Sequence, residues 1–367
     1  MTVHIHGEQP APIRLLVADD SPTVRALIRA MVAHDPDISV VGEAVDGREA
    51  VSLSRLLRPN VVLMDIQMPG MDGREATEQI MASCPVPVIA FSSHIAGKDS
   101  KDSMDMLAAG AIDVMAKPDF TDETMMARGA HQLIHKIRCA FRAPMNRRPR
   151  GGARDPVPAV CPVAGLDAAR PYAAVGIGAS SGGPGALREL FSHLPPSFPL
   201  PVLIVQHITP GFSAGFVEWL QHCSPLKVRH SGPQDVAATG TVLVAPEGRQ
   251  MVARKGGVVQ ALSDQPKGVH LPSIDVLFSS MADVYGSGAI GVILTGMGAD
   301  GVEGLLEIRN AGGLTIAQDW ETSVVFGMPG EAVRREAAQI VLSPRKLAEY
   351  LVRLVAAPSR VREGEGA

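Results

Sequence analysis

Cysteine is scarce in this chain of 367 residues, which contains only Cys84, Cys139, Cys161 and Cys223. No two of them form a C-x-x-C pair, which argues against a sulfur-ligated zinc site and fits a reducing compartment. Long apolar runs are also missing, since none approaches the roughly 20 residues that a membrane span needs. The first residues, MTVHIHGEQP, have neither the basic start nor the apolar core of a secretory signal. These absences predict a cytoplasmic protein without membrane insertion.

An excess of charge of one sign is missing too, because the formal net charge is −4 at pH 7 and the pI is about 6.3. This balance gives no support to nucleic acid or an anionic membrane surface as a partner. Hydrophobic residues make up 46% of the chain and charged residues 20%, which is typical of a globular protein. At a prior of roughly 150 residues per domain, the length predicts two domains.

A stretch with the composition of a linker divides the chain at residues 142–171. It is rich in Pro, Gly, Ala and Arg and shows neither a strand period nor a helix period. Five arginines lie between Arg142 and Arg154. We interpret the segment as a solvated, flexible tether, and docking to an acidic surface is the less favoured alternative.

The N-terminal half alternates apolar segments with helical stretches, a pattern typical of a parallel α/β sheet. We expect strands at 13–18, 38–44, 61–65, 87–91 and 111–115. Asp19 and Asp20 follow the first strand, Asp65 ends the third and Lys117 follows the fifth, so these side chains should meet at the carboxyl edge of the sheet. Converging carboxylates repel one another unless a cation joins them, and hard oxygen ligands suit Mg²⁺. A carboxylate beside Mg²⁺ and a lysine can accept a phosphoryl group, because both cations neutralise the charge that builds up in transfer.

Over residues 12–135 this half resembles the receiver domain of two-component response regulators, which has a flavodoxin-like (βα)5 fold. The resemblance rests on DDS at 19–21, MDIQMPGMDG at 64–73, SS at 92–93 and KP at 117–118. It implies that Asp65 is phosphorylated and that Ser92 and Lys117 hold the phosphoryl oxygens. It also implies Mg²⁺ as the cofactor of this domain, bound at Asp20 and Asp65 with Asp19 assisting and the Gln67 carbonyl as a further ligand. Val114 stands where many receivers carry an aromatic switch residue, so we do not expect an aromatic rotamer switch there.

Two other interpretations of this half are less favoured. The aspartates could merely cap helices, which would account for one or two of them but not for the whole set. The segment HQLIH at 131–135 puts two histidines one helical turn apart. A zinc protease motif needs glutamate where Gln132 stands, so we expect partly exposed helix histidines rather than a metal site.

The C-terminal half contains the segment GIGASSGG at 176–183, directly after an apolar run. A dinucleotide-binding turn needs glycine or alanine in the sixth place, where Ser181 stands, and an acidic residue that closes a strand about 20 residues on. That acidic residue is missing. The nucleophile pattern G-x-S-x-G is complete at 178–182, with Ser180 at its centre. The segment therefore favours a nucleophile turn over a phosphate-binding loop.

Three near-continuously apolar segments, 173–179, 201–207 and 289–296, predict parallel strands covered on both faces. Ser180 follows the first, His207 ends the second and Asp300 lies just beyond the third, which supplies the nucleophile, base and orienting acid of serine acyl transfer. Singly, each has a simpler explanation, as a turn residue, a polar strand end and the N-cap of a helix that begins near Gly301. The chain order Ser, His, Asp differs from that of α/β-hydrolases, so we expect a different parallel α/β fold, a Rossmann-like serine hydrolase domain.

Over nearly its whole length the chain is similar to the chemotaxis protein-glutamate methylesterases, in which a receiver domain is fused to a C-terminal esterase, here residues 172–357. The distinctive segments are GIGASSGGPGAL (176–187), VQHITPGFSAGF (205–216), LPSIDVLFSSMA (271–282), LTGMGADG (294–301) and FGMPGEA (326–332). The resemblance implies a catalytic triad of Ser180, His207 and Asp300. It implies an oxyanion contact from the Met297 backbone N–H, with Ser181 as a second donor. Ala299 stands where many relatives have asparagine before the catalytic aspartate.

The reaction implied by this resemblance is hydrolysis of glutamate γ-methyl esters on the cytoplasmic helices of methyl-accepting chemoreceptors, together with deamidation of receptor glutamines. A histidine kinase of the chemotaxis type would be the phosphodonor, and the esterase chemistry would need no cofactor. We expect the unphosphorylated receiver to cover the Ser180 face. The alternative is a response regulator with a non-catalytic DNA- or partner-binding output domain. A DNA-binding output should show a short helix-turn-helix with a basic recognition helix, whereas residues 172–357 show an extended α/β pattern.

Overall fold

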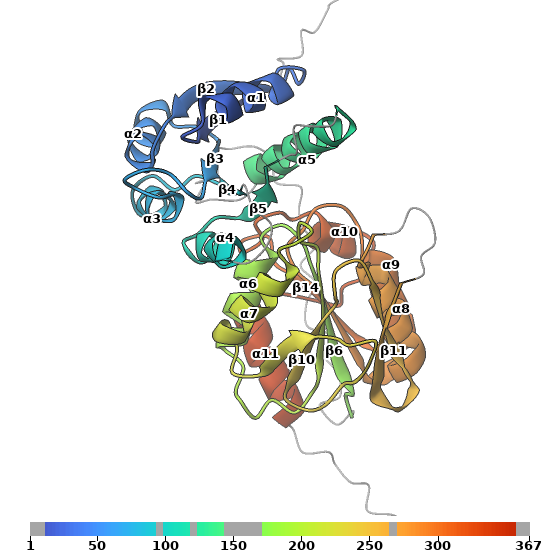
Figure 1. Cartoon of the computed structure of the whole chain (residues 1–367). Helices are drawn as coiled ribbons and strands as arrows, with labels where there is room; N and C mark the ends of the chain where they lie inside the picture. The colour runs from blue at the N-terminus through green and yellow to red at the C-terminus, as the bar shows by residue number, and fades with distance from the viewer. Residues whose placement is uncertain (1–11, 93–97, 118–122, 143–170, 264–269, 357–367) are drawn as a thin grey trace, which may run out of the picture. The chain divides into compact units, whose positions relative to one another are not determined.

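The computed structural model describes residues 12–92, 98–117, 123–142, 171–263 and 270–356 of the chain. These residues form two compact units, each built on its own parallel sheet (Figure 1). The predicted linker at 142–171 lies outside the described ranges except for its first and last residues. The predicted limits of the two domains therefore stay predictions.

The first unit has five parallel strands in the order β2-β1-β3-β4-β5, the flavodoxin-like order expected of a receiver. All five predicted strands are present, with bounds shifted by at most two residues. The strands are β1 (Ile13–Ala18), β2 (Ile38–Ala44), β3 (Val61–Asp65), β4 (Val88–Ser92) and β5 (Asp113–Ala116). The helices that follow these strands along the chain are α1 (Pro22–Val32), α2 (Gly47–Leu57), α3 (Gly73–Ser83), α4 (Lys98–Ala108) and α5 (Glu123–Arg142).

Helix starts in this unit are fixed by side-chain caps. The Ser21 hydroxyl accepts from the N–H of Val24 at the start of α1. Asp46 and Asp72 accept in the same way at the starts of α2 and α3. The aspartates predicted to bind metal are not the caps of these helices, so capping does not explain them.

The second unit has seven parallel strands in the order β15-β14-β13-β6-β7-β10-β8. The strands are β6 (Ala174–Ala179), β7 (Val202–Gln206), β8 (Lys227–His230), β10 (Thr241–Val244), β13 (Ala289–Ile293), β14 (Leu314–Gln318) and β15 (Ile340–Leu342). The sequence predicts only the three central ones, β13, β6 and β7. Central strands are buried on both faces and read as apolar runs, whereas the edge strands β15 and β8 are three and four residues long and give little signal.

A small antiparallel sheet and six helices complete this unit. The antiparallel strands are β9 (Gln234–Val236), β11 (Gln250–Arg254) and β12 (Val258–Leu262). The helices are α6 (Gly183–Ser192), α7 (Ser213–Cys223), α8 (Ile274–Tyr285), α9 (Val302–Asn310), α10 (Met328–Arg334) and α11 (Pro344–Ala356). Helix α6 packs against α7 and α11, and α9 packs against α8 and α10, so the central sheet is covered on both faces (Figure 1). Within the described ranges, no helix has the length and apolar composition of a membrane span.

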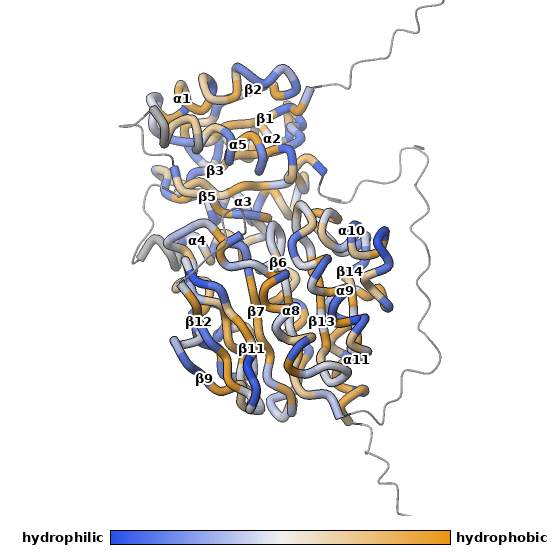
Figure 2. The backbone as a smooth tube through the Cα atoms, turned by 90° about the vertical axis from the view of Figure 1, so that its right-hand side faces the viewer, coloured by the Kyte–Doolittle hydropathy of each residue, from blue (hydrophilic) through white to orange (hydrophobic). Residues whose placement is uncertain are grey.

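Strand β6 is the point at which the sheet order reverses. The chain passes from β6 to β7 on one side and reaches β13 on the other side only much later. Ligands of open parallel sheets bind at such switch points, beyond the carboxyl ends of the strands. Figure 2 shows apolar residues along β6, β7 and β13 in the interior of the unit.

Two glycines on β6 bring helix α8 close to this switch point. A Cβ on Gly176 would lie 2.5 Å from Met281 Sδ, and one on Gly178 would lie 2.3 Å from Ile274 Cγ2. Any larger residue on this face of β6 would push α8 away from the sheet. The close approach sets the N-terminus of α8 beside the carboxyl ends of β6 and β13.

Candidate functional site

The receiver unit gathers three carboxylates at the carboxyl edge of its sheet. Oxygen atoms of Asp19, Asp20 and Asp65 all lie within 4.8 Å of one another. Asp19 and Asp65 are buried and Asp20 is exposed, so the cluster opens to solvent on one side. The structure thus brings together the three carboxylates predicted to bind metal.

Lys117 joins this cluster from the end of β5. Its Nζ lies 2.7 Å from Asp19 Oδ2 and 2.9 Å from Asp65 Oδ2. Its backbone N–H donates to the carbonyl of Ser92, the buried last residue of β4, at 2.6 Å. Ser93 and Pro118, which belong to the motifs of the receiver resemblance, lie outside the described residues.

The electrostatics of the cluster favour binding of a cation. Burial raises the pKa of Asp65 to about 6, even though Lys117 and the Gln67 backbone N–H oppose this shift. Burial alone would lower the pKa of Lys117, but its contacts with the two carboxylates raise it above the usual value. One lysine faces three carboxylates, and their hard oxygen donors fit Mg²⁺. A Gln67 carbonyl ligand stays a prediction.

Among the described residues, His131 and His135 of the HQLIH segment are not part of a potential metal cluster. Both are exposed on α5. The expectation of surface histidines is confirmed.

We predict that Asp65→Asn stabilises the metal-free receiver. Because the folded pKa of Asp65 lies above its ordinary value of 3.8, the ionised carboxyl destabilises the fold. This penalty is absent below pH 3.8, grows as the pH rises to about 6, and is complete above that. A two-unit shift corresponds to about 3 kcal/mol in the free energy of unfolding.

Thermal unfolding of the full chain in EDTA at pH 8 measures this effect. The variant should unfold at a higher temperature than wild type, the difference should shrink at pH 5, and added Mg²⁺ should stabilise wild type more than the variant. A less stable variant at pH 8 would contradict the proposed charge balance.

In the second unit, Ser180 lies in a sharp turn between β6 and α6. Its N–H donates to Thr295 O at 3.0 Å, and its carbonyl accepts from Gly183 N and from the side chain of Gln206, each at 2.8 Å. Gly182 completes the turn at φ +77, where a Cβ would lie 2.4 Å from Val324 Cβ. The strand, turn and helix predicted from G-x-S-x-G are all present, and Ser180 is half-buried at the switch point.

His207 follows β7, beside the Ser180 turn. Its backbone N–H donates to Ala179 O at 2.9 Å, which ties the end of β7 to the end of β6. Its Nε2 lies 2.9 Å from Asp300 Oδ2, although the N–H direction departs from the line between the two atoms. The structure thus brings the predicted base and the predicted acid together.

Asp300 lies at the N-terminus of α8. Its carboxylate accepts from the Ser273 hydroxyl at 2.9 Å, from Ile274 N at 2.8 Å and from Asp275 N at 3.2 Å. It does not cap α9, whose N-cap is Gly301 and which has no side-chain cap. The simpler explanation of Asp300 as the N-cap of the helix that begins near Gly301 is therefore wrong, because its partners come from the start of α8, 26 residues earlier in the chain.

These contacts determine the ionisation of Asp300. Burial alone would raise the pKa of its carboxyl, but His207 and the N–H groups of Ile274 and Asp275 outweigh burial and hold the pKa well below its usual range. Anions are favoured at a helix N-terminus for the same reason. Burial raises the pKa of the neighbouring Asp275 to about 6, and the charge of Asp300 adds to that shift. Asp300 is therefore the more acidic member of this pair and stays negative beside His207.

The loop after β13 contacts Ser180 through Gly296. A Cβ on Gly296 would lie 2.7 Å from Ser180 Cβ. The Gly296 carbonyl accepts from the N–H groups of Gly327 and Met328, and because a trans peptide is planar, the Met297 N–H must point the opposite way. The predicted oxyanion donor thus belongs to a peptide that is fixed alongside the predicted nucleophile.

Ser181, the predicted second donor, follows Ser180 in the turn. Its carbonyl accepts from the Thr295 hydroxyl at 3.0 Å, which holds the turn against the end of β13. Ala299, which replaces the asparagine of many relatives, is exposed next to Asp300. Neither observation tests an oxyanion role.

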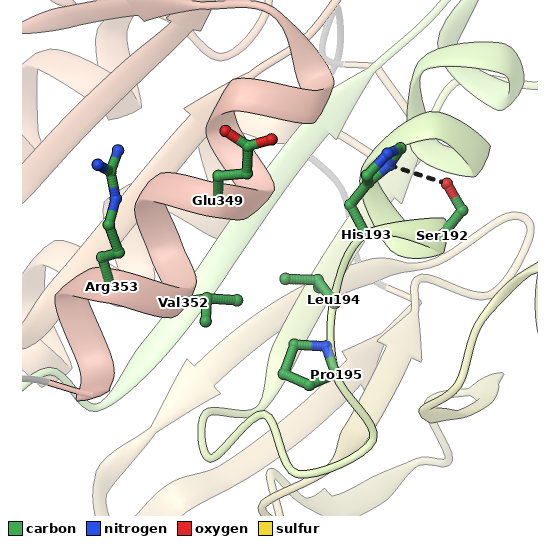
Figure 3. A pocket seen from close by; sticks show the side chains of 7 residues that line it. All are labelled: Ser192, His193, Leu194, Pro195, Glu349, Val352 and Arg353. Atoms are coloured by element: carbon green, nitrogen blue, oxygen red, sulfur yellow. Dashed lines mark hydrogen bonds between the residues drawn. The ribbon is translucent and has the colours of Figure 1, made fainter.

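Among the described residues, cavities lie at both ends of α6. One of 540 Å³ lies between the C-terminal end of α6 and α11, and its lining includes His193, Glu349 and Arg353 (Figure 3). The other, of 360 Å³, is lined in part by Gly182, next to the Ser180 turn, and by Val324. Neither lining includes Ser180, His207 or Asp300.

One residue that sequence reasoning missed contacts the predicted base. The ring of His270 stacks on that of His207 with the centroids 4.8 Å apart and an interplanar angle of 24°. No short motif marks this contact, because 63 residues separate the two histidines and the chain contains eleven histidines in all.

The fold and these sites define a class of protein, a response regulator whose output domain is a parallel α/β hydrolase. Residues 15–129 match the response regulator receiver domain family, and residues 175–351 match the CheB methylesterase family. The chain belongs to the CheB methylesterase family in its receiver-linked form. These matches do not favour a non-catalytic output domain.

Two named relatives are similar to the chain over nearly its whole length. Protein-glutamate methylesterase/protein-glutamine glutaminase 4 of Myxococcus xanthus is 42% identical over 93% of this chain and 96% of that protein. The protein-glutamate methylesterase/protein-glutamine glutaminase of Nitrosospira multiformis is 38% identical over 96% of this chain and 99% of that protein. The solved catalytic domain of the Thermotoga maritima CheB methylesterase is 36% identical with a TM-score of 0.48, covering 50% of this chain and 99% of that domain.

We predict that Gly296→Ala impairs Ser180 reactivity by at least about tenfold, since an angstrom-scale displacement of a catalytic group has effects of this order. The new Cβ would lie 2.7 Å from Ser180 Cβ and 2.3 Å from Met328 Sδ, so one of them must move. Reactivity is measured as the rate at which a fluorophosphonate, a reagent for activated serines, labels the protein. Gly185→Ala is the matched control, because a Cβ there meets nothing within 4 Å. Equal labelling rates for the two variants would contradict the packing described.

Proposed function

We propose that this protein hydrolyses glutamate γ-methyl esters on chemoreceptors, under control of phosphorylation at Asp65, and that Ser180, His207 and Asp300 carry the reaction. The observation that supports this best is the arrangement of the three residues beyond the carboxyl ends of β6, β7 and β13, which are neighbours in one sheet. The family of the chain supplies the substrate class. The protein would act in the cytoplasm, where the methylated helices of these receptors lie.

The contact between His207 and Asp300 sets the roles of the two ring nitrogens. Because Asp300 Oδ2 lies 2.9 Å from Nε2, we place the imidazole N–H on Nε2 and the lone pair on Nδ1. Nδ1 would then take the proton of the Ser180 hydroxyl as the oxygen attacks the ester carbonyl. Asp300 would stabilise the imidazolium.

The acyl-enzyme forms and breaks with the same groups. His207 returns its proton to the methoxy oxygen, methanol leaves, and the receptor glutamyl group remains esterified to Ser180. Water, deprotonated by His207, attacks this ester. The bond between the acyl carbon and Ser180 Oγ breaks, His207 returns the proton to Oγ, and the glutamate side chain leaves as an acid that ionises to the carboxylate. A glutamine side chain passes through the same intermediate with ammonia as the leaving group, so deamidation is part of the proposal.

The Met297 backbone N–H would stabilise the oxyanion of each tetrahedral intermediate, with Ser181 as the second donor. Support comes from the closeness of Gly296 to Ser180 and from the fixed plane of the peptide between Gly296 and Met297. One such donor contributes about 3 kcal/mol to the transition state.

The receiver would accept its phosphoryl group on Asp65 from a histidine kinase of the chemotaxis type. Asp19, Asp20 and Asp65 would hold Mg²⁺ together with the Gln67 carbonyl, and the bound ion would neutralise part of the charge on the phosphoryl oxygens. Lys117 lies within contact distance of Asp65, and Ser92 ends the neighbouring strand β4. These two side chains would contact the phosphoryl oxygens.

Ser180→Ala should lower the rate of methanol release by about 10⁶, because loss of a triad nucleophile has that effect. His207→Ala should be similarly severe, and Asp300→Asn should cost about 10⁴ through loss of the correct imidazole tautomer. A double variant should be little worse than Ser180→Ala, since the groups act as a unit. His193→Ala, at the far end of α6, is the control for histidine loss. The measurement is methanol release from methylated receptor membranes, and near wild-type release by Ser180→Ala would eliminate this mechanism.

Phosphorylation should raise turnover, and Asp65→Ala should remove this response while leaving basal turnover unchanged. Acetyl phosphate with Mg²⁺ serves as the phosphodonor, and the fragment 172–367 serves as the unregulated reference. Each 1.4 kcal/mol of bias between a restrained and an active form changes turnover about tenfold while the active form is minor. Two results together would contradict negative control by the receiver. The fragment would release methanol no faster than the unphosphorylated chain, and wild type would not respond to the phosphodonor despite confirmed phosphorylation of Asp65.

A further inference from the structure

The face of the His207 ring is covered by a second imidazole. The ring centroids of His207 and His270 lie 4.8 Å apart at 24°, within the range of stacked aromatic pairs. The contact with Asp300 holds only the Nε2 edge of the His207 ring. A ring held at one edge can still turn about that contact, and a stacked partner restricts this rotation.

His270 begins a turn, residues 270–275, whose last two residues are the first two of α8, and a buried amide holds this turn in place. The Gln250 Nε2 donates to the His270 carbonyl at 2.7 Å, and its Oε1 accepts from Ser273 N at 2.7 Å. Gln250 is 3% exposed, so neither bond competes with bulk water. One side chain thus sets the positions of both ends of the segment from His270 to Ser273.

The same turn also holds the acid of the proposed triad. The Ser273 hydroxyl and the N–H groups of Ile274 and Asp275 donate to the Asp300 carboxylate. The turn therefore contacts His207 in two ways, directly on the ring face through His270 and indirectly at Nε2 through Asp300.

We infer that His270 is a positioning residue, which stacks on His207 and holds its imidazole at the angle that serves Ser180 and Asp300 together. This inference rests on the proposed function, because it assigns His207 as the base. His270 donates and accepts no proton in the reaction. Its contribution comes from its aromatic face, so another flat ring can replace it.

His270 is exposed, and an exposed side chain beside a catalytic site can instead contact the substrate. The two roles differ in their kinetics. A positioning residue changes the reactivity of Ser180 toward any acylating reagent and lowers kcat. A docking residue raises KM and leaves that reactivity unchanged.

The test compares His270→Ala, His270→Phe and the neighbouring control Leu271→Ala in the full-length protein. Leu271 lies on the same turn with a side chain that is 40% exposed. For each protein, kcat and KM are measured by methanol release from methylated receptor membranes, and the rate of Ser180 labelling is measured with a fluorophosphonate. Circular dichroism and thermal unfolding check the fold of each variant.

For His270→Ala we expect kcat and the labelling rate to fall together by about 10- to 100-fold, the cost of a misplaced catalytic group, at nearly constant KM. His270→Phe should recover most of both rates. Leu271→Ala should label as fast as wild type.

Wild-type rates in a folded His270→Ala protein would overturn the inference, as would a raised KM with unchanged labelling. If His270→Ala does not fold, the inference is judged from His270→Phe. A labelling rate of folded His270→Phe that is 10- to 100-fold below that of wild type would also overturn the inference. The labelling rate separates this inference from the proposed function. If wild type labels at Ser180 but releases no methanol, the proposed substrate is wrong, and the role of His270 is still judged from labelling.

Discussion

The carboxylate of Asp300 lies at the N-terminus of α8 and accepts three hydrogen bonds there, and its Oδ2 also contacts His207. A buried anion is costly unless donors compensate it, so these bonds permit a charged group at this depth. They also require α8, the loop after β13 and the end of β7 to be in place together. The glycines of β6 allow this by letting α8 approach the sheet, so the strand that ends in Ser180 also sets the position of the donors to Asp300.

Each of the two proposed sites lies at the carboxyl edge of its own parallel sheet. The sites differ in how the negative charge of their carboxylates is compensated. In the receiver, Asp19, Asp20 and Asp65 face a single lysine, and the excess negative charge creates a place for a cation and a phosphoryl group. In the hydrolase unit, protein donors compensate the one carboxylate of the triad, so its charge is used to orient and stabilise an imidazole.

The sequence predicts the positions of these sites well because both depend on strand ends. Central strands such as β6, β7 and β13 are continuous apolar runs, and the residues that follow them must share one edge of the sheet. Contacts between segments distant in the chain leave no such pattern. The bonds from the 270–275 turn to Asp300, the two bonds from Gln250 to that turn and the stacking of His270 on His207 were therefore beyond prediction. Asp300 taken singly also fitted a helix cap, and only its position together with Ser180 and His207 favoured the triad. The short strands β8 and β15 were missed because three or four residues carry too little periodicity.

The most direct test of the account is the location of a covalent adduct. Full-length protein is treated with a fluorophosphonate until labelling stops, digested and sequenced by tandem mass spectrometry, and residual methanol release is measured on the same sample. The account predicts one adduct per chain, on Ser180, with activity lost in proportion to labelling, and it predicts that Asp300→Asn labels far more slowly. An adduct on another residue, or full activity in protein labelled completely at Ser180, would contradict it.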